Sequence, residues 1–210
     1  MTRTTARVPP ELARRPIRVL RPQDAAGVYT HPRPEFARLT RTSALHRIAT
    51  GYYAIVPDDQ TGQNWLPDLE SVAAGVAAAD EGVDTVALMG LSAARVHGAI
   101  PRALAVATVA AGRHRRPLRL ADRDATVLFA RRAVPALDVE RRAGELGPHW
   151  VTTVEQTLLD LAARPEFGDL PGEAHAAVRA LLPRADRDIL DELAVAQRRR
   201  AALRRALAGG

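Results

Sequence analysis

Hydrophobic and polar positions in residues 35–42 follow the period of an amphipathic helix. Phe36 and Leu39 lie three positions apart, so both face the same side of such a helix and predict its buried face. The opposite, exposed face carries Arg38, Arg41 and Thr42. We therefore expect a helix that packs on a core with one side and presents two arginines with the other.

The segments around this helix predict a known order of elements. A short helix is expected over residues 23–27, because a proline precedes it and a glycine ends it. Residues 45–48 and 52–56 are rich in β-forming side chains and flank a turn at 49–51, so they predict a β-hairpin. A helix-turn-helix followed by a hairpin is a winged helix-turn-helix, which we predict for residues 16–57.

The rest of the chain predicts a mixed α/β domain that ends in helices. Buried runs and β-rich segments predict strands at 85–89, 103–110, 118–120, 125–131, 139–143 and 149–152, with hairpin turns at 113–116 and 122–124. Helical patterns and caps predict helices at 69–79, 93–97, 153–163, 172–182 and 186–207. The predicted fold class is therefore α+β.

Composition shifts divide the chain into four parts. Residues 1–15 are rich in Arg, Thr and Pro and predict an extended basic arm before the winged helix. Residues 58–67 are polar, contain glycine and end in proline, so we expect a linker there. Residues 68–210 form the α/β domain. The longest apolar runs fall short of the ~20 residues that a membrane helix needs, and the N-terminus has no apolar signal core, so we expect a cytoplasmic protein that does not bind a membrane.

Basic charge is concentrated at the start of the chain. All 30 basic residues are arginine, and the formal net charge is +6. Residues 1–57 hold ten arginines against three acids, a charge of +7, whereas residues 58–210 hold twenty arginines against twenty-one acids. A general preference for arginine would not remove acids locally. This asymmetry therefore predicts a polyanionic partner for the N-terminal part.

The absence of lysine and cysteine excludes several kinds of chemistry. Without lysine there can be no P-loop NTPase, Schiff-base or pyridoxal enzyme, or lysine-dependent nuclease. Without cysteine there can be no thiol nucleophile, cysteine zinc site, iron–sulfur cluster or disulfide. The six histidines show no metal-ligand spacing, so we expect no metal, cofactor or catalytic residue.

Double-stranded DNA is the polyanion that suits a winged helix. A helix fits the major groove, where arginine reaches guanine, while the hairpin follows the backbone or minor groove. The expected contacts are Arg18, Arg21, Arg33, Arg38, Arg41, Thr42, Ser43, His46, Arg47, Thr50 and Tyr52, with Arg3 and Arg7 in the arm. A winged helix that binds only protein is the alternative.

Two polar pairs in the α/β domain invite an enzymatic interpretation. Ser92 and His97 could be a nucleophile and a base, but their spacing separates them on a helix, so we expect Ser92 to be an N-cap. Asp122 and Asp124 resemble the metal-binding pair of a nucleotidyltransferase, although they fall in a predicted turn. A degenerate nucleotidyltransferase using this pair therefore remains a rival hypothesis.

The helix expected at 153–163 begins with a capping box, in which Thr153 caps the N3 amide and Gln156 reaches back. Asp160 lies within its apolar stripe, so it is either a structural partner of backbone or arginine groups, which we favour, or part of a site. The last helix places acids first and arginines last, which suits its dipole and predicts a solvated cover of the core, with a docking surface as the alternative.

Three segments resemble the AbiEi-type antitoxins of type IV toxin–antitoxin systems. The predicted hairpin ends in Gly51-Tyr52-Tyr53, where the family has a Gly-Val-Tyr-like turn. Residues 91–98 (LSAARVHG) are close to its Ser-Ala-x-x-x-His-Gly, and residues 151–162 (VTTVEQTLLDLA) to its Thr-x-Glu-Arg-Thr-Leu-x-Asp-Leu-Ala. The chain departs from the family at Gln156, where arginine is usual.

This resemblance implies a transcriptional repressor that binds inverted repeats in the promoter of its own operon, and it allows a homodimer on that DNA. It also implies an α/β domain that counteracts an AbiEii-type nucleotidyltransferase toxin encoded beside it. The basic N-terminal pattern supports the first function. No spacing in residues 67–210 indicates how a toxin would be controlled.

Overall fold

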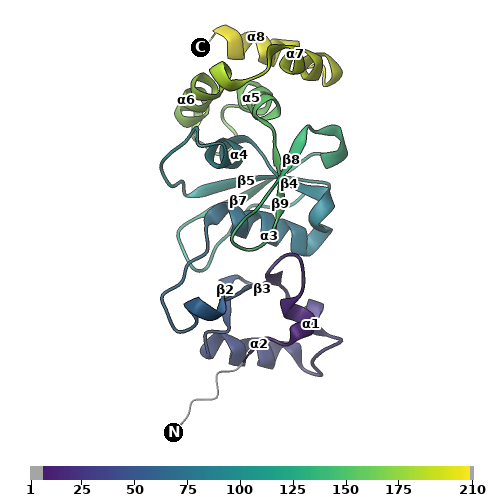
Figure 1. Cartoon of the computed structure of the whole chain (residues 1–210), viewed down its shortest axis with the longest axis vertical. Helices are drawn as coiled ribbons and strands as arrows, with labels where there is room; N and C mark the ends of the chain where they lie inside the picture. Colours follow the sequence, from purple (N-terminus) through teal and green to yellow (C-terminus); the bar gives the residue numbers. More distant parts are fainter. Residues whose placement is uncertain (1–6, 209–210) are drawn as a thin grey trace.

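The computed structural model describes residues 7–208 and confirms a mixed α/β fold, with 45% helix and 18% strand. Its strands form a three-stranded sheet near the N-terminus and a six-stranded sheet in the middle of the chain. Figure 1 shows the two sheets stacked along the long axis of the molecule, with the last helices at the end farthest from the three-stranded sheet. None of the helices in residues 7–208 has the length and apolar character that crossing a bilayer requires.

The N-terminal unit is built from helices and a small antiparallel sheet. Its elements are α1 (Pro10–Ala13), β1 (Val19–Leu20), the 3₁₀ helix η1 (Pro22–Ala25), α2 (Pro32–Arg41), β2 (Leu45–Ala49) and β3 (Tyr52–Ile55). Strand β3 pairs with both β1 and β2, and Gly51 at φ +85° makes the β2–β3 turn. The predicted hairpin is confirmed. Helix α2 begins three residues earlier than predicted, because proline is well accepted in a first helical turn.

One face of the small sheet packs against α2. Phe36 and Leu39 are fully buried there with Leu20 and Leu45, as the helical spacing predicted. Tyr53 meets the Phe36 ring edge-on, with the centroids 5.1 Å apart. This core holds α2 on the side of the unit that lies away from the larger sheet (Figure 1).

The other face of the small sheet is also buried, against α3 (Leu69–Glu81). Val19, Ile48 and Ala54 share one hydrophobic core with the alanine-rich α3. A Cβ atom on Gly75 would lie 2.4 Å from Val19 Cγ2, so only glycine lets α3 approach this closely. The N-terminal unit and the larger sheet are therefore joined through a shared core.

Two segments expected to be loose are part of this structure. Within the predicted 1–15 arm, α1 is helical and Leu12 is buried at 2% exposure in the α2 core. Within the predicted 58–67 linker, Asp58–Gln60 form the 3₁₀ helix η2, and Trp65 packs on the shared core while its Nε1 donates to Glu145 Oε1 at 2.7 Å. Helix α1 thus differs from the extended conformation expected for that part of the arm, and in both segments one large apolar side chain anchors an otherwise polar stretch of chain.

The larger sheet has the order β6-β7-β5-β4-β9-β8. Its strands are β4 (Val86–Leu88), β5 (Val106–Ala111), β6 (Leu118–Arg119), β7 (Thr126–Arg131), β8 (Val139–Arg142) and β9 (His149–Thr152). Strand β7 pairs with β5 in parallel and β6 pairs with β7, so the β6–β7 hairpin at 122–124 is confirmed and the one predicted at 113–116 is wrong. The six-residue β7 pairs along all of β5, whereas the two-residue β6 with its exposed Arg119 suits an edge.

Helices cover both faces of the larger sheet. Helix α3 lies on one face, and α4 (Gly90–Val96) lies on the other beneath α5 (Val154–Ala163), as Figure 1 shows. Helices α6 (Pro171–Leu181), α7 (Arg187–Ala196) and α8 (Arg200–Ala208) pack around α5. The α5 side therefore buries its own leucine-rich core.

The single helix predicted over 186–207 is two helices. Arg198, at φ 55°, separates α7 from α8 in the left-handed conformation. Neither glycine nor proline lies at the break, so local propensity gives no warning of it. The flanking Gln197 and Arg199 hydrogen-bond to side chains of α5, and these tertiary contacts stabilise the break.

Candidate nucleic-acid interface

The outer side of α2 carries arginines that point to solvent. Arg33, Ala37 and Arg41 are exposed and follow one another at four-residue intervals, on the side opposite Phe36 and Leu39. Neither Arg33 nor Arg41 forms an ion pair with any residue in the described part of the chain. Their guanidinium groups are therefore available to an external anion.

The remaining predicted residues of α2 contribute less. Arg38 Nε donates to Glu35 Oε2 at 2.9 Å, so its charge is partly balanced on the same helix. Thr42 Oγ1 donates to the Leu39 carbonyl at 3.1 Å, and Ser43 follows in the left-handed conformation at φ 58°. Thr42 and Ser43 thus end the helix, a role that the sequence interpretation had missed.

The β2–β3 ribbon places a further arginine on the α2 side of the small sheet. Arg47 is exposed and lies directly opposite Tyr53, the residue that packs on Phe36. Its Nη2 lies 3.4 Å from Thr50 Oγ1 in the exposed turn. We call Arg33, Arg41 and Arg47 the arginine face.

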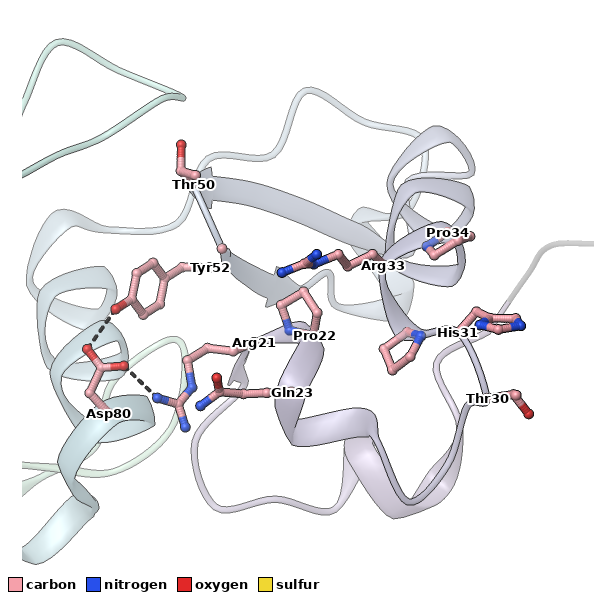
Figure 2. A pocket seen from close by; sticks show the side chains of 12 residues that line it. Arg21, Pro22, Gln23, Thr30, His31, Arg33, Pro34, Thr50, Tyr52 and Asp80 are labelled. Carbon is pink, nitrogen blue, oxygen red and sulfur yellow. Dashed lines mark hydrogen bonds and ion pairs between the residues drawn. The ribbon is translucent and has the colours of Figure 1, made fainter.

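An open hollow of about 630 Å³ separates the start of α2 from the ribbon turn. Arg33, Thr50 and Gln23 are among the residues around it. Figure 2 shows the Arg33 side chain extending from α2 toward the ribbon, while Tyr52 and Arg21 both point to Asp80 on the far side of the hollow. The hollow is thus bordered by the guanidinium of Arg33, unpaired within residues 7–208, on one side and by the ion-paired Arg21 and Asp80 on the other.

Asp80, near the end of α3, organises that polar cluster. Its carboxylate accepts hydrogen bonds from Tyr52 Oη at 2.6 Å and Arg21 Nη1 at 2.7 Å, and it pairs with Arg115 Nη2 at 2.6 Å. Burial, together with the hydrogen bond to Asp80, raises the pKa of Tyr52 to about 12. Hydrogen bonds to Asp24 and Asp80 raise the pKa of Arg21. We call Asp80, Arg21, Tyr52 and Arg115 the Asp80 cluster.

Three predicted DNA contacts are therefore occupied within the chain. Arg21 and Tyr52 belong to the Asp80 cluster, and His46 Nε2 lies 2.8 Å from Asp122 Oδ2 of the larger domain. Strand alternation places His46 and Tyr52 on the α3 side of the small sheet, and Arg21, just after β1, reaches Asp80 of α3. This geometry removes them from the surface that we consider for DNA.

The arm residues surround a second hollow. Arg7 and Arg14 are exposed and line it together with Ala44 and Ile55. Arg15 Nη1 lies 3.6 Å from Asp24 Oδ2, and Arg18 is exposed beside β1. Arg3 lies outside the described residues.

Asp122 and Asp124, the pair considered as metal ligands of an enzyme, do not point to a common site. Asp122 bonds His46 and Arg123, whereas the side chain of Asp124 is 92% exposed and pairs with Arg119 at 3.0 Å. Burial acts to raise the pKa of Asp122, but hydrogen bonds from Arg123 and His46 outweigh it and lower that pKa. Within residues 7–208, no group of three or more His, Asp or Glu side chains is placed to hold a metal.

The other proposed pair is also separated. Ser92 lies inside α4, where its Oγ accepts the Thr108 amide at 2.9 Å, so the N-cap prediction was wrong because the helix starts two residues earlier, at Gly90. His97 Nε2 lies 2.7 Å from the Thr152 carbonyl. Each side chain fixes a different part of the fold.

Only one of the two hydrogen bonds of the predicted capping box is present at the start of α5. Thr153 Oγ1 accepts the Gln156 amide at 3.3 Å, but the Gln156 side chain turns inward, to Asp160 and Gln197, instead of back to the cap. Gln156 is fully buried, and a buried side-chain amide needs hydrogen-bond partners inside the protein, so it bonds Asp160 and Gln197.

No pattern in the sequence indicated the Asp80 cluster. Asp80 and Glu81 are adjacent acids at the end of an alanine-rich helix, a position that would normally be solvated. Only the docking of α3 on the small sheet brings Asp80 to Arg21 and Tyr52. No protein-family model matches the chain, and no curated protein is similar enough to it to count as a relative.

Proposed function

We propose that the chain is a DNA-binding transcriptional repressor and antitoxin whose N-terminal unit acts as a winged helix. The order helix, strand, short helix, helix and hairpin, with β3 between β1 and β2, supports this proposal. In that arrangement α2 would enter the major groove and the β2–β3 ribbon would follow the neighbouring backbone.

The observation that carries the proposal is the arginine face. Arg33 and Arg41 lack internal ion pairs within residues 7–208, while Arg21, which lies toward α3, is balanced by Asp24 and Asp80. Unpaired guanidinium groups on an exposed helix suit phosphates and guanine edges, which accept hydrogen bonds from arginine in pairs.

The antitoxin part of the proposal rests on the resemblance to AbiEi-type proteins. Two of the three resembling segments, 91–98 and 151–162, are far apart in sequence. They correspond to α4 and to the end of β9 with α5, which pack on each other, and His97 bonds the carbonyl of Thr152. This supports a role for the two segments as one structural unit. The partner would be an AbiEii-type nucleotidyltransferase-like protein.

DNA binding is tested with the full chain and the promoter DNA upstream of its gene. Fluorescence anisotropy is measured at several salt concentrations for the wild type, Arg41→Ala, Arg33→Ala and the control Arg200→Ala, which removes an exposed arginine of α8. With ~6 phosphate contacts, the slope of log K against log salt should be near −5. Arg41→Ala and Arg33→Ala should weaken binding, and Arg200→Ala should not. Wild-type affinity in both α2 variants would refute the proposed interface.

Antitoxin activity is tested separately by co-expression with a nucleotidyltransferase-like protein encoded beside the gene. The wild-type chain should restore growth that this protein inhibits. Failure to restore growth would reject the antitoxin function and leave the DNA measurements to decide the repressor function.

A further inference from the structure

A small cavity lies on the α5 side of the larger sheet, away from the arginine face. Its volume is about 40 Å³, and its apolar walls include Met89, Ala130 and Phe167. Gly90 and Ala130, which have little or no side chain, also line it. A water needs about 10–15 Å³ of such space, so the cavity suits a small polyatomic ion and is too small for a nucleotide.

Asp160 forms the polar wall of this cavity, and one of its oxygens is unsatisfied. The side chain is 1% exposed, and its Oδ1 accepts Arg132 Nη1 at 2.9 Å, Arg199 Nη1 at 2.6 Å and Gln156 Nε2 at 3.2 Å. Its Oδ2 is buried and has no hydrogen-bond partner among the described residues. A buried carboxylate oxygen without a donor is costly, so the arrangement favours a ligand that brings a proton to it.

Three arginines line the same cavity. Arg132 and Arg199 share Asp160 Oδ1, and Arg164, at the end of α5, stacks on Phe167 with its guanidinium 4.9 Å from the ring centre. Burial lowers the pKa of Arg199, and the like charges of Arg132 and Arg164 lower it further against the attraction of Asp160. Three guanidinium groups around one carboxylate leave excess positive charge beside the cavity.

The site depends on the break between α7 and α8. Gln197 bonds Gln156 and Arg132, and Arg199 reaches Asp160, so the two residues that flank Arg198 both turn inward. A continuous helix would advance ~100° per residue and could not direct both side chains to α5 in this way. The left-handed Arg198 therefore serves to assemble the cluster.

We propose that this cavity binds hydrogen phosphate. The ionised oxygens of the anion accept hydrogen bonds from Arg132, Arg164 and Arg199, and its P–OH group donates to Asp160 Oδ2. This arrangement balances the excess positive charge of the three arginines and gives Asp160 Oδ2 a hydrogen-bond donor. Sulfate has the same shape but carries no proton at neutral pH, so it would place an oxygen against the Asp160 carboxylate.

The proton requirement also separates free phosphate from a phosphate group on a larger molecule. A phosphomonoester loses its last proton near pH 6. Inorganic phosphate still carries one proton at about pH 8. Inorganic phosphate should therefore bind at both about pH 5.5 and about pH 8, whereas methyl phosphate should bind only at the lower pH.

The test is isothermal titration of the full chain with sodium phosphate and with sodium sulfate at equal ionic strength. Phosphate should bind at least roughly 10-fold more tightly than sulfate, the difference expected for one charge-assisted hydrogen bond. Equal affinity for the two anions, or no binding of phosphate, would overturn the proposal. Binding of methyl phosphate at about pH 8 as tight as that of phosphate would also overturn it, because the proton would then have no role.

Two variants locate the site. Arg164→Gln should weaken phosphate binding roughly 10- to 100-fold and leave the unfolding temperature of the free protein largely unchanged, because the carboxylate of Asp160 is bonded by Arg132 and Arg199, whereas the Arg164 guanidinium only stacks on Phe167. Arg200→Gln, an exposed neighbour on α8, should bind phosphate normally. Asp160→Asn offers an amide donor and should remove the preference for phosphate over sulfate. If Asp160→Asn does not fold, Arg164→Gln decides, and its wild-type affinity would refute the site.

Discussion

Asp80→Ala is the substitution that most directly tests how the N-terminal unit is attached. It removes the carboxylate that joins Arg21 and Tyr52 of the small sheet region to Arg115 of the larger domain. Arg21 would keep Asp24, at 3.0 Å, whereas Tyr52 Oη would keep only the neighbouring Arg115, 3.3 Å away. The expected result is a loss of stability together with weaker coupling between the two parts of the chain.

The size of this loss follows from the three contacts. A hydrogen bond to a charged group contributes about 1.5–3 kcal/mol, and breaking a fully buried ion pair costs about 3–5 kcal/mol. The side chains of Asp80, Arg21 and Arg115 are 20%, 21% and 16% exposed, so water compensates part of the loss. We expect Asp80→Ala to lower the free energy of unfolding by about 2–4 kcal/mol.

Urea denaturation at neutral pH, followed by circular dichroism, measures this change. The control is Asp191→Ala, which removes an exposed acid of α7 and should change stability by less than about 0.5 kcal/mol. Tyr52→Phe removes the hydrogen bond from Tyr52 to Asp80 and should cost about 1.5 kcal/mol, the lower end of the range for a hydrogen bond to a charged group. If Asp80→Ala behaved like the control, the Asp80 cluster would not hold the two parts together.

Three further outcomes are expected. Arg41→Ala should make the salt slope of promoter binding shallower by about 0.9, the effect of one lost phosphate contact, and an unchanged slope would place Arg41 outside the interface. Because the pKa of Tyr52 is raised to about 12 in the folded chain, its contribution to stability should be complete below about pH 10 and should fall as the pH rises toward 12. Comparison of pH-dependent unfolding of the wild type and Tyr52→Phe measures this, and identical profiles would contradict it. Gly75→Val should lower the free energy of unfolding by about 1–3 kcal/mol, because its Cβ would lie 2.4 Å from Val19 Cγ2. If urea denaturation gave the variant the same free energy of unfolding as the wild type, α3 would be able to move away from the small sheet.

Local patterns predicted most of the secondary structure. The spacing of Phe36 and Leu39 identified the buried side of α2, and the β-rich runs around Gly51 identified the ribbon. These features depend on neighbours within a few residues, which the sequence displays directly. The β5–β7 pairing and the α7–α8 break depend on partners distant in sequence, and no local pattern contained them.

The candidate interface was predicted only in part for a related reason. Charge density identified the N-terminal unit, and Arg33, Arg41 and Arg47 are exposed there. The number of arginines and acids in this segment could not show that Arg21 is ion-paired, because its partner Asp80 is 59 residues away in the sequence.

The sequence by itself determined most of the helical and extended segments, the classes of chemistry excluded by the absence of lysine and cysteine, and the place where positive charge is concentrated. The tertiary structure decided which charges remain free. Docking of α3 neutralises one arginine of the N-terminal unit, and the break before α8 gathers Arg132 and Arg199 on Asp160. The physical reason is that a side chain's charge is a property of composition, whereas its availability depends on burial and on partners that only the folded chain brings within reach.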